Sequence, residues 1–464
     1  MNLQINKKNT IYFIGIGGIG MSGIALIMKN LGYNVKGSDL SKKSKILDQL
    51  KKKKINVVWG HETKAILKAD MIVVSTAINF KNKEYQLAKK NKIPIVKRAD
   101  MLAHLINLKK NIIISGSHGK TTITSLVSHL LKDNKFYPMI VNGGIINSLN
   151  SNATVGKGQW SVVEADESDG SFLKFKSIYS VVSNIDKEHM DYYKSFKNLN
   201  KYLKKFLNKK TLLLKNILFI EYKNIKKIIK KNKNKNYLTY GFSKKANLQC
   251  KNVKNINMGM KFDIYVNLPN KKKIIKDVNI KLMGIHNVLN ATATFGVGLL
   301  LNIKIEKIIK SLFSFSGVQR RLTLIYQKNK SLIYDDYAHH PTEIQAVLKA
   351  CKNNFNKKKI IAIFQPHRYS RLLSLYNNFT KSFSYADRVL ICPVYSAGEK
   401  NKNFKFNKFC KDILTNSSVE VVQVNSKDEI ELYLKKNMIN NVIVAMGAGS
   451  ISSWIRDISK KFNR

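Results

Sequence analysis

Residues 112–125 combine the residue types that bind a nucleotide phosphate. Their sequence, IIISGSHGKTTITS, runs from an apolar segment through a glycine-bearing loop into a helical pattern. Gly116 and Gly119 let the backbone turn tightly with its N–H groups inward, and Lys120 adds a positive charge where the helix begins. Thr121 stands where a hydroxyl reaches a bound Mg²⁺. The spacing G-x-x-x-x-G-K-[ST] would require glycine at position 114, which is isoleucine, so an ordinary strand-to-helix turn is the alternative.

A second glycine loop lies near the N-terminus. The pattern G-x-G-x-x-G is formed by Gly15, Gly17 and Gly20, between an apolar strand pattern and a helical pattern. Asp39 ends the next strand pattern roughly 20 residues further on. This arrangement predicts a ligand with a diphosphate and a ribose, and it does not distinguish NAD from another such ligand. The alternative is a turn that needs its glycines for close packing.

Acidic residues are scarce in this chain, yet a cluster of them directly follows an apolar strand pattern. The 29 Asp and Glu residues include Glu164, Asp166, Glu167 and Asp169. A carboxylate at the end of a strand beside a phosphate loop is placed to hold Mg²⁺, which takes oxygen ligands. A cluster that complements a helix dipole is the alternative. His189 also follows an apolar strand pattern, but imidazole suits softer metals, so this histidine alone indicates no site.

Arginines stand out in a chain whose basic residues are mostly lysine. Arg320 and Arg321 are adjacent in the sequence. Arg368 and Arg371 are three residues apart, which would place them on one face of a helix. Guanidinium groups bind phosphates and carboxylates through two hydrogen bonds at once. We therefore expect both pairs to bind anionic groups, and solvent-facing positions are the alternative.

A further polar group lies between a strand pattern and a helical pattern, and its members are Asp335, Asp336, His339 and His340. Loops in this position meet ligands in open α/β sheets. Two adjacent aspartates and two adjacent histidines cannot all converge on one metal ion without strain. We therefore expect them to contact phosphate, ribose or substrate. Pro341, directly after them, is tolerated in the first turn of a helix.

The order of patterns predicts three α/β domains in 464 residues. Apolar strand patterns alternate with helical patterns in the first segment, restart at residue 112 and restart again after residue 317. Such alternation predicts parallel sheets with helices on their faces. We place the domains at residues 1–108, 109–317 and 318–464. Residues 200–281 are rich in Lys and Asn and have weak periodicity.

The formal charge of +53 comes from 82 Lys and Arg against 29 Asp and Glu. Such an excess is typical of proteins that bind nucleic acid or anionic membranes. Here the lysines are spread along the chain among Asn and Ile, which favours solvated surface over a dedicated nucleic-acid site. The four cysteines form no C-x-x-C pair, and the sequence has neither a signal-peptide pattern nor an apolar run of about 18 residues. We expect a cytoplasmic protein without membrane insertion.

Nine motifs, in order along nearly the whole chain, resemble those of the Mur ligase family. They are GIGGIGMSGIA at 15–25, GSHGKTT at 116–122, EADESDGSF at 164–172, NIDKEHMDY at 184–192, GIHNVLNA at 284–291, GVQRR at 317–321, DDYAHHPTE at 335–343, FQPHRYSR at 364–371 and GAGSI at 447–451. The resemblance implies an N-terminal Rossmann-like domain, a central P-loop-type ATPase domain with a mixed sheet, and a C-terminal Rossmann-like domain. It also implies a short form of the phosphate loop.

The resemblance further implies ATP and Mg²⁺ as cofactors. The ATP phosphates would lie against Gly116, Ser117, His118, Gly119, Lys120, Thr121 and Thr122. Lys120 would contact the β- and γ-phosphates, and Thr121 one Mg²⁺. Glu164 and His189 would bind a second Mg²⁺. The contacts to adenine, phosphate and ribose would be completed by Asn287, Asn290, Arg321 and Asp336.

The substrates that the resemblance implies are UDP-N-acetylmuramate and L-alanine, joined after ATP phosphorylates the sugar's carboxylate. The substrate-binding residues would be Gly15, Gly17, Gly18, Gly20, Asp39, Ser75, His339 and His367. The catalytic residues would be Lys120, His189, Arg321, Arg368 and Arg371. We expect a monomer or a weak dimer.

Three other functions remain open. A ligase that attaches a whole tripeptide to UDP-N-acetylmuramate shares the core motifs, although the form GIGGIGMSG of the first loop favours L-alanine. An NAD-dependent oxidoreductase would suit the first domain but would leave Lys120 and Glu164 without a role. A nucleic-acid-binding protein would account for the charge, and it predicts an affinity that falls steeply with salt.

Overall fold

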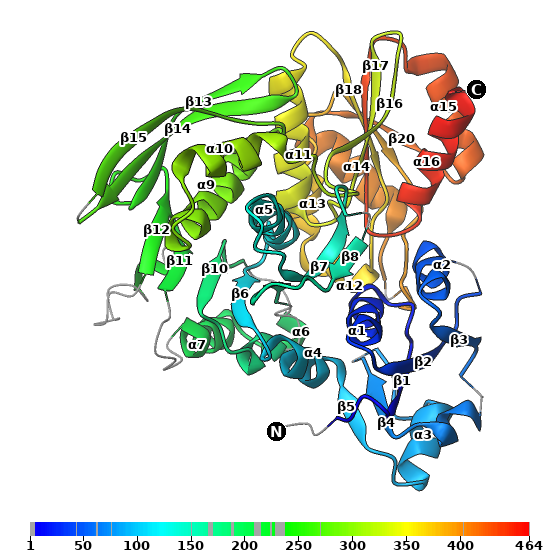
Figure 1. The fold of residues 1–464 in the computed structure, drawn as a ribbon. Coiled ribbons are helices and arrows are strands. Elements are labelled where there is room, and N and C mark those ends of the chain that lie inside the picture. The colour runs from blue at the N-terminus through cyan, green and yellow to red at the C-terminus, as the bar shows by residue number, and fades with distance from the viewer. Residues whose placement is uncertain are drawn as a thin grey trace. The chain divides into compact units, whose positions relative to one another are not determined.

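The computed structural model describes residues 5–42, 44–61, 64–75, 77–149, 151–165, 170–186, 190–207, 215–222, 225–227, 237–269, 271–401 and 403–463. In these ranges the chain forms three successive α/β regions, each built on its own sheet (Figure 1). The chain divides into two compact units, residues 1–250, 265–274 and 290–312, and residues 251–264, 275–289 and 313–464. Within the described ranges, none of the helices has the length and apolar composition needed to cross a bilayer.

The first region is a five-stranded parallel sheet of order β3-β2-β1-β4-β5. Its strands are β1 (Thr10–Ile14), β2 (Asn34–Asp39), β3 (Asn56–Trp59), β4 (Met71–Val74) and β5 (Ile95–Lys97). Its helices are α1 (Ile19–Asn30), α2 (Lys45–Lys52), the short η1 (Lys64–Lys68), α3 (Lys83–Lys90) and α4 (Arg98–Ile106). Strand β1 is buried on both faces, since Phe13 packs in one core and Tyr12 in another. The strand order reverses between β1 and β4, which creates the crevice where open α/β sheets bind ligands.

The second region is a ten-stranded sheet of order β15-β14-β13-β12-β11-β10-β6-β9-β7-β8. The phosphate loop joins β6 (Lys110–Ser115) to α5 (Lys120–Asp133). The other strands are β7 (Met139–Ile146), β8 (Ser151–Thr154), β9 (Trp160–Glu164), β10 (Tyr179–Val182), β11 (Lys215–Phe219), β12 (Tyr237–Gly241), β13 (Leu248–Ile256), β14 (Gly259–Leu268) and β15 (Lys271–Ile280). The other helices are η2 (Ser171–Lys174), α6 (Met190–Tyr193), α7 (Phe196–Leu207), α9 (Ile285–Leu300) and α10 (Ile305–Ser314). Strands β7 and β8 pair antiparallel while β6 pairs parallel with both neighbours, so the predicted mixed sheet is confirmed.

The Lys/Asn-rich residues 200–281 hold much of α7 and the strands β11–β15 within the described ranges. The last of these strands, β15, lies at the edge of the sheet, and most of its first seven residues are exposed. Lysines on an exposed edge strand discourage pairing with another chain. An edge strand exposed in this way does not show a clear alternation of apolar and polar residues, which explains the weak periodicity of its sequence.

The third region is a six-stranded sheet of order β16-β17-β21-β18-β19-β20. Its strands are β16 (Thr323–Lys328), β17 (Ser331–Asp336), β18 (Ile360–Phe364), β19 (Arg388–Ile391), β20 (Glu420–Gln423) and β21 (Val442–Met446). Its helices are α11 (Pro341–Asn354), α12 (Tyr369–Ser374), α13 (Tyr376–Thr380), α14 (Phe406–Ser417), α15 (Lys427–Asn437) and α16 (Ile451–Phe462). Strands β16 and β17 form an antiparallel hairpin, and the other pairs are parallel. Pro341 begins α11, as predicted.

Candidate functional site

The phosphate loop has a shape that requires glycine at two positions. Gly116 and Gly119 have φ values of 127° and 84°, which side-chain-bearing residues rarely adopt. A Cβ on Gly116 would lie 2.3 Å from Ser183 Oγ, and a Cβ on Gly119 would lie 2.7 Å from Asn290 Oδ1. Position 114 needs no glycine, because Ile114 belongs to strand β6 and is fully buried in the sheet.

Side chains from the segment after β10 fix the backbone of this loop. Asn184 Oδ1 accepts a hydrogen bond from His118 N at 2.7 Å. Asp186 N donates to Ser117 Oγ at 2.8 Å, and His118 Nε2 lies 2.9 Å from Asp186 Oδ2. A loop held by several contacts in this way is preorganised, so its N–H groups need little rearrangement to bind an anion.

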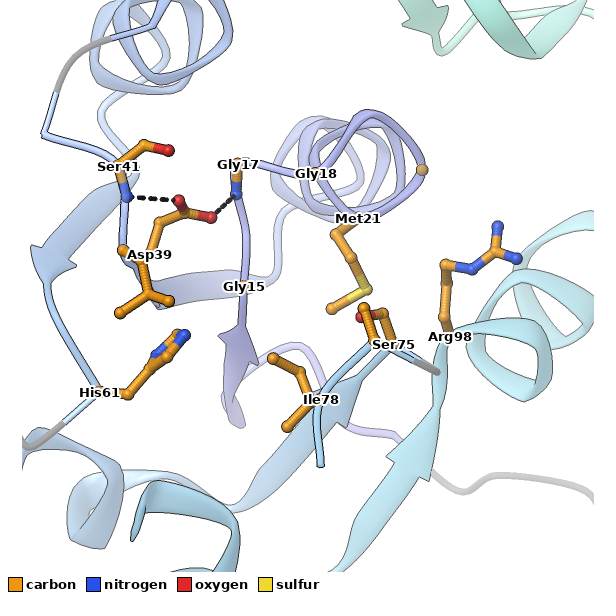
Figure 2. A pocket seen from close by; sticks show the side chains of 13 residues that line it. Gly15, Gly17, Gly18, Met21, Asp39, Ser41, His61, Ser75, Ile78 and Arg98 are labelled. Carbon is orange, nitrogen blue, oxygen red and sulfur yellow. Dashed lines mark hydrogen bonds between the residues drawn. The ribbon is translucent and has the colours of Figure 1, made fainter. Parts of the chain in front are cut away.

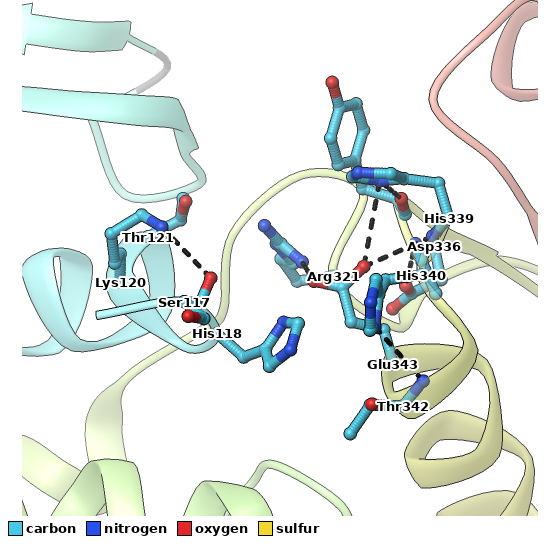
Figure 3. A network of polar contacts seen from close by, with 12 residues as sticks. Ser117, His118, Lys120, Thr121, Arg321, Asp336, His339, His340, Thr342 and Glu343 are labelled. Carbon is cyan, nitrogen blue, oxygen red and sulfur yellow. Dashed lines mark hydrogen bonds and ion pairs between the residues drawn. The ribbon is translucent and has the colours of Figure 1, made fainter. Parts of the chain in front are cut away.

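Lys120 lies in the first turn of α5, close to the loop carbonyls (Figure 3). Its Nζ donates to Gly116 O at 2.6 Å and to Ser117 O at 3.0 Å. A phosphate bound at the N-terminus of α5 would therefore lie beside both the loop N–H groups and this ammonium. The structure thus brings together the predicted phosphate-binding residues of the loop.

Thr121 and Glu164 present oxygen atoms to one another beside the loop. Thr121 Oγ1 donates to Glu164 Oε1 at 3.0 Å, and Gly143 N donates to Glu164 Oε2 at 2.6 Å. A hydroxyl and a carboxylate are ligands of the kind that Mg²⁺ takes, so this pair fits the predicted metal site. The remaining predicted ligand, His189, lies outside the described residues, as do the neighbouring acids Asp166, Glu167 and Asp169.

The two asparagines predicted to contact adenine lie near the start of α9. Asn290 approaches the phosphate loop, since its Oδ1 is the atom that a side chain on Gly119 would meet. Asn287 Nδ2 donates to Met283 O at 2.8 Å and lies 3.2 Å from His286 Nε2. Both asparagines are buried. Their contact with adenine stays a prediction.

A pocket of about 620 Å³ lies at the point where the strand order of the first sheet reverses (Figure 2). Its lining contains all the substrate-binding residues predicted in this region, namely Gly15, Gly17, Gly18, Gly20, Asp39 and Ser75. Asp39 Oδ2 accepts a hydrogen bond from Gly17 N at 2.7 Å, and Asp39 Oδ1 accepts one from Ser41 N at 2.9 Å. The carboxylate therefore fixes the shape of the glycine loop.

In the third region, Asp336 connects the segment that carries Arg321 to the loop after β17 (Figure 3). Its Oδ1 accepts from Ala338 N and its Oδ2 from Leu322 N, both at 2.6 Å. Burial raises the pKa of Asp336 to about 6, although the charge of Arg321 and the two hydrogen bonds act to lower it. Arg321 Nη1 lies 3.9 Å from Glu343 Oε1.

His339, His367 and Arg371 come together at the carboxyl ends of β17 and β18. The ring centroids of the two histidines are 6.0 Å apart, and Arg371 Nη1 lies 3.3 Å from His367 Nδ1. Burial lowers the pKa of His339 to about 4 and that of His367 to about 4. Both imidazoles are therefore neutral at pH 7, and the positive charge of this group belongs to Arg371.

Arg368 lies outside the helix that it was predicted to share with Arg371. Helix α12 begins at Tyr369, and Arg368 precedes it with a φ of 67°. Its backbone N donates to Tyr395 O at 2.9 Å, in the loop after β19. This connection holds Arg368 out of the helical conformation, so the prediction that the two guanidinium groups share one helical face is wrong.

Asp335 and Asp336 were both predicted to contact phosphate, ribose or substrate, but their side chains face opposite sides of the sheet. Successive residues of a strand point in opposite directions. Asp335 is fully buried, and its Oδ2 accepts from Arg456 Nε at 2.7 Å and from Ser452 Oγ at 2.8 Å. The carboxylate of Asp335 thus attaches α16 to β17, and the ligand contact predicted for it is replaced by an internal ion pair.

Two further residues with predicted ligand contacts make structural contacts. His340 precedes α11, and its Nδ1 accepts from Thr342 N at 3.3 Å as a helix cap. Arg320 Nη2 donates to Gly447 O at 2.7 Å, and its guanidinium lies 4.6 Å from the centroid of the Tyr337 ring. These contacts stabilise the loops around Asp336.

The sequence is similar to known proteins over almost its whole length. Residues 10–110 match the Mur ligase family, catalytic domain, residues 114–298 match the Mur ligase middle domain, and residues 320–449 match the Mur ligase, glutamate ligase domain. A UDP-N-acetylmuramate–L-alanine ligase of Pelagibacter ubique is 45% identical over 461 residues, which cover 99% of each chain. The chain belongs to the Mur ligase family.

Other relatives of this Mur ligase agree with that assignment. A ligase of the same name from Rickettsia bellii is 39% identical over an alignment of 472 positions, which covers 99% of this chain and 98% of its own. The solved structure of a UDP-N-acetylmuramate-alanine ligase from Thermotoga maritima has a TM-score of 0.84 at 27% identity and covers 98% of this chain and 99% of its own. The predicted fold, three α/β domains with a mixed central sheet, is confirmed. The domain boundaries at residues 108 and 317 stay predictions.

The pocket of this Mur ligase also has lining residues that were not predicted from the sequence, among them His61 and Arg98. His61 follows β3 and Arg98 follows β5. The carboxyl ends of parallel strands lie at one edge of a sheet, so a search for polar residues just after each predicted strand would have found both. A Cβ on Gly20 would lie 2.9 Å from Arg98 Nη1, which indicates how closely α4 approaches the glycine loop.

Two further residues near His367, Tyr395 and Glu399, were not predicted from the sequence, and both lie in the loop after β19. The Tyr395 ring stacks on the His367 ring with centroids 5.5 Å apart. Glu399 accepts from Ser370 N at 3.0 Å and from Ser370 Oγ at 2.8 Å, at the start of α12. These contacts hold the loop after β19 against the helix that carries Arg371.

The neutral state of His339 predicts a measurable pH dependence of stability. Its pKa is lowered by burial from 6.5 to about 4, so between these values the unfolded chain takes up a proton that the folded chain does not. Stability should therefore fall as the pH falls, with a contribution from His339 of about 2 kcal/mol between pH 7 and 5. The variant His339→Asn keeps a hydrogen-bond donor for Tyr337 O. Urea unfolding of this variant at pH 7 and pH 5 should show a decrease in the free energy of unfolding that is smaller than in the wild type by about this amount. An equal loss in both proteins would contradict the neutral assignment.

Proposed function

We propose that this Mur ligase joins L-alanine to the carboxylate of UDP-N-acetylmuramate, with ATP converted to ADP and phosphate. The observation that carries the proposal is the 45% identity, over 99% of both chains, to a protein with the name of that activity. The geometry supports it, because the chain contains a pocket beside a dinucleotide-type glycine loop and a preorganised phosphate loop with its lysine. An NAD-dependent oxidoreductase would need the pocket beside the glycine loop but would have no use for the phosphate loop.

The proposed reaction has two steps, transfer of a phosphoryl group to the sugar carboxylate and formation of the amide bond. A carboxylate oxygen of the sugar attacks the γ-phosphorus of ATP, and ADP leaves. The amine of L-alanine then attacks the acyl carbon, phosphate leaves with the former carboxylate oxygen, and the amine loses a proton. Phosphoryl transfer depends mainly on positioning and charge stabilisation, so Lys120 and the loop N–H groups would stabilise the charge on the transferring group.

Thr121 would contact one Mg²⁺, and Glu164, together with the predicted ligand His189, would contact a second. When bound, the ions would neutralise part of the negative charge on the nucleotide phosphates. Asn287, Asn290, Arg321 and Asp336 remain predictions for the nucleotide. Gly15, Gly17, Gly18, Gly20, Asp39 and Ser75 would bind the UDP-sugar. A cytoplasmic location, a monomeric or weakly dimeric state and the absence of a nucleic-acid partner also remain proposals.

Arg371 would bind the carboxylate of L-alanine, with His367 and His339 as neutral hydrogen-bonding neighbours. Arg371→Lys keeps the charge and removes the planar fork that contacts two oxygens at once. We expect the KM for L-alanine to rise roughly tenfold or more, with the KM for ATP unchanged. Steady-state phosphate release at varied L-alanine and varied ATP measures both values. An increase confined to the KM for ATP would contradict this role and would indicate that Arg371 contacts the nucleotide.

The choice of amine is tested by supplying ATP, Mg²⁺ and UDP-N-acetylmuramate with either L-alanine or the tripeptide. Phosphate release should require L-alanine. Release with the tripeptide alone would replace the proposal by the tripeptide ligase. NAD binding without UDP-sugar binding would support the oxidoreductase, and competition between DNA and ATP would support the nucleic-acid-binding protein.

A further inference from the structure

A buried carboxylate lies next to the pocket of the first region, and the reaction described above gives it no role. Glu84 lies on α3 and is 1% exposed. Its Oε1 accepts from the hydroxyl of Tyr12 on β1 at 2.9 Å, and its Oε2 accepts from the hydroxyl of Ser38 on β2. His61 Nδ1 lies 3.1 Å from the same Oε2. Within the described part of the chain, His61 is the one basic side chain in contact with the carboxylate of Glu84.

The hydrogen bonds around Glu84 determine which nitrogen of His61 carries a proton. Ser38 gives its hydroxyl hydrogen to Glu84, so Ser38 Oγ, 3.0 Å from His61 Nδ1, is an acceptor toward the histidine. The carboxylate oxygen is an acceptor as well. Because both atoms that approach Nδ1 are acceptors, Nδ1 must be protonated. Burial and the charge of Glu84 raise the pKa of Tyr12, so its phenol also remains a donor to the carboxylate.

The protonation of Nδ1 determines what the other nitrogen of the His61 ring, Nε2, can bind. His61 lines the pocket together with the glycine loop and Asp39 (Figure 2). With Nδ1 directed to Glu84 and Ser38, the opposite ring nitrogen, Nε2, makes no hydrogen bond with the residues that the structure describes and can bind a ligand. In the neutral ring this Nε2 is a hydrogen-bond acceptor of fixed direction.

A purely structural explanation of Glu84 is unfavourable. A carboxylate costs free energy to bury, and an apolar side chain in the same volume would pack without that cost. The three contacts of Glu84 are made with β1, β2 and His61, and β1 and β2 are the strands that carry the glycine loop and Asp39. Buried polar groups that hold a ligand-facing side chain in one orientation are a common support for binding sites.

We propose that Glu84 is a positioning residue for the nucleotide-sugar pocket, which acts by holding His61 with Nδ1 protonated and Nε2 directed to the ligand. This inference rests on the proposed function, in which the pocket binds UDP-N-acetylmuramate. Glu84 itself would not touch the ligand. Its removal should therefore affect the affinity for the sugar and leave the chemistry at the phosphate loop unchanged.

The test uses Glu84→Met, which keeps the length of the side chain and removes both acceptor oxygens, and Glu84→Gln, which retains one. We expect the Kd for UDP-N-acetylmuramate, measured by calorimetric titration, to rise roughly tenfold in Glu84→Met and by less in Glu84→Gln. The Kd for ATP and the kcat at saturating sugar should not change. A merely structural role would move all three quantities together with the melting temperature.

A double-mutant cycle separates positioning from general damage. In a His61→Ala background, Glu84→Gln should have no further effect on the Kd for the sugar, because Glu84 acts through His61. The matched control is Glu431→Gln, which alters a buried helical glutamate of the third region that is paired with Lys435 and Lys461. It should leave the Kd for the sugar at the wild-type value.

The outcomes distinguish this proposal from the proposed function. If the wild-type protein does not bind UDP-N-acetylmuramate, the proposed function is wrong. If the wild type binds it and Glu84→Met binds it equally well, the positioning role is wrong while the function stands. Full additivity of Glu84→Gln and His61→Ala would also overturn the positioning role, because it would mean that Glu84 does not act through His61.

Discussion

Lys120→Ala should lower the rate of phosphate release by roughly 100- to 1,000-fold, the loss typical when one charge-stabilising donor is removed from a preorganised site. Lys120 Nζ lies over the loop carbonyls at the N-terminus of α5, where a phosphate would bind. Lys120 contributes two hydrogen bonds to the loop, but Gly116, Gly119 and the contact with Asn184 also fix the loop geometry, so the loop should keep its shape. Steady-state phosphate release at saturating substrates measures the effect.

Lys132→Ala is the matched control for this variant. Lys132 is exposed in the last turn of the same helix and should be replaceable without loss of rate. Calorimetric titration with UDP-N-acetylmuramate should give the wild-type Kd in both variants, because the pocket of the first region contains neither lysine. Wild-type phosphate release by Lys120→Ala would show that the loop does not bind the transferring phosphate.

Glu164→Gln should raise the Mg²⁺ concentration needed for half-maximal activity by at least about 100-fold, since even residues outside the first coordination shell change metal affinity 10- to 100-fold. Glutamine can still accept the hydrogen bond from Thr121 or that from Gly143 N, so the fold around the site should be retained. The charge that attracts the cation is removed. Phosphate release measured across a range of Mg²⁺ concentrations gives the half-maximal value.

Glu221→Gln is the matched control, because Glu221 Oε1 also accepts backbone hydrogen bonds, from Phe242 N and Ser243 N, both at 2.8 Å. The Mg²⁺ dependence of this variant should match that of the wild type. If Glu164→Gln shows the same dependence as Glu221→Gln, the metal is held by other residues, and the pairing of Thr121 with Glu164 is structural.

The architecture could be predicted from the sequence because the buried strands are readable as apolar runs. Parallel strands covered on both faces are continuously hydrophobic, as in IIIS before the phosphate loop and IIAIF in β18. Glycine loops and the aspartate at the end of β2 mark the carboxyl edge of a sheet in the same way. These patterns located the glycine residues and the aspartate that line the pocket, and the loop between β6 and α5; the ligands of both sites stay predictions.

The failures occurred where contacts distant in the sequence determine a side chain's role. Arg368 has helical spacing from Arg371, but its backbone is held by the loop that contains Tyr395. Asp335 looks equivalent to Asp336 in the sequence, and only the pairing of β17 with its neighbours determines which one faces α16. His61 and Glu84 are unremarkable by composition, and the fold is needed to bring them together.

The acyl-phosphate route is tested most directly with UDP-N-acetylmuramate in which both carboxylate oxygens are isotopically labelled. In a complete reaction with ATP, Mg²⁺ and L-alanine, each phosphate released should contain one labelled oxygen, because the carboxylate oxygen attacks the γ-phosphorus and stays with the leaving phosphate. Omission of any one substrate should abolish the release of labelled phosphate. Alanyl product accompanied by unlabelled phosphate would contradict the route and the placement of the reaction at Lys120.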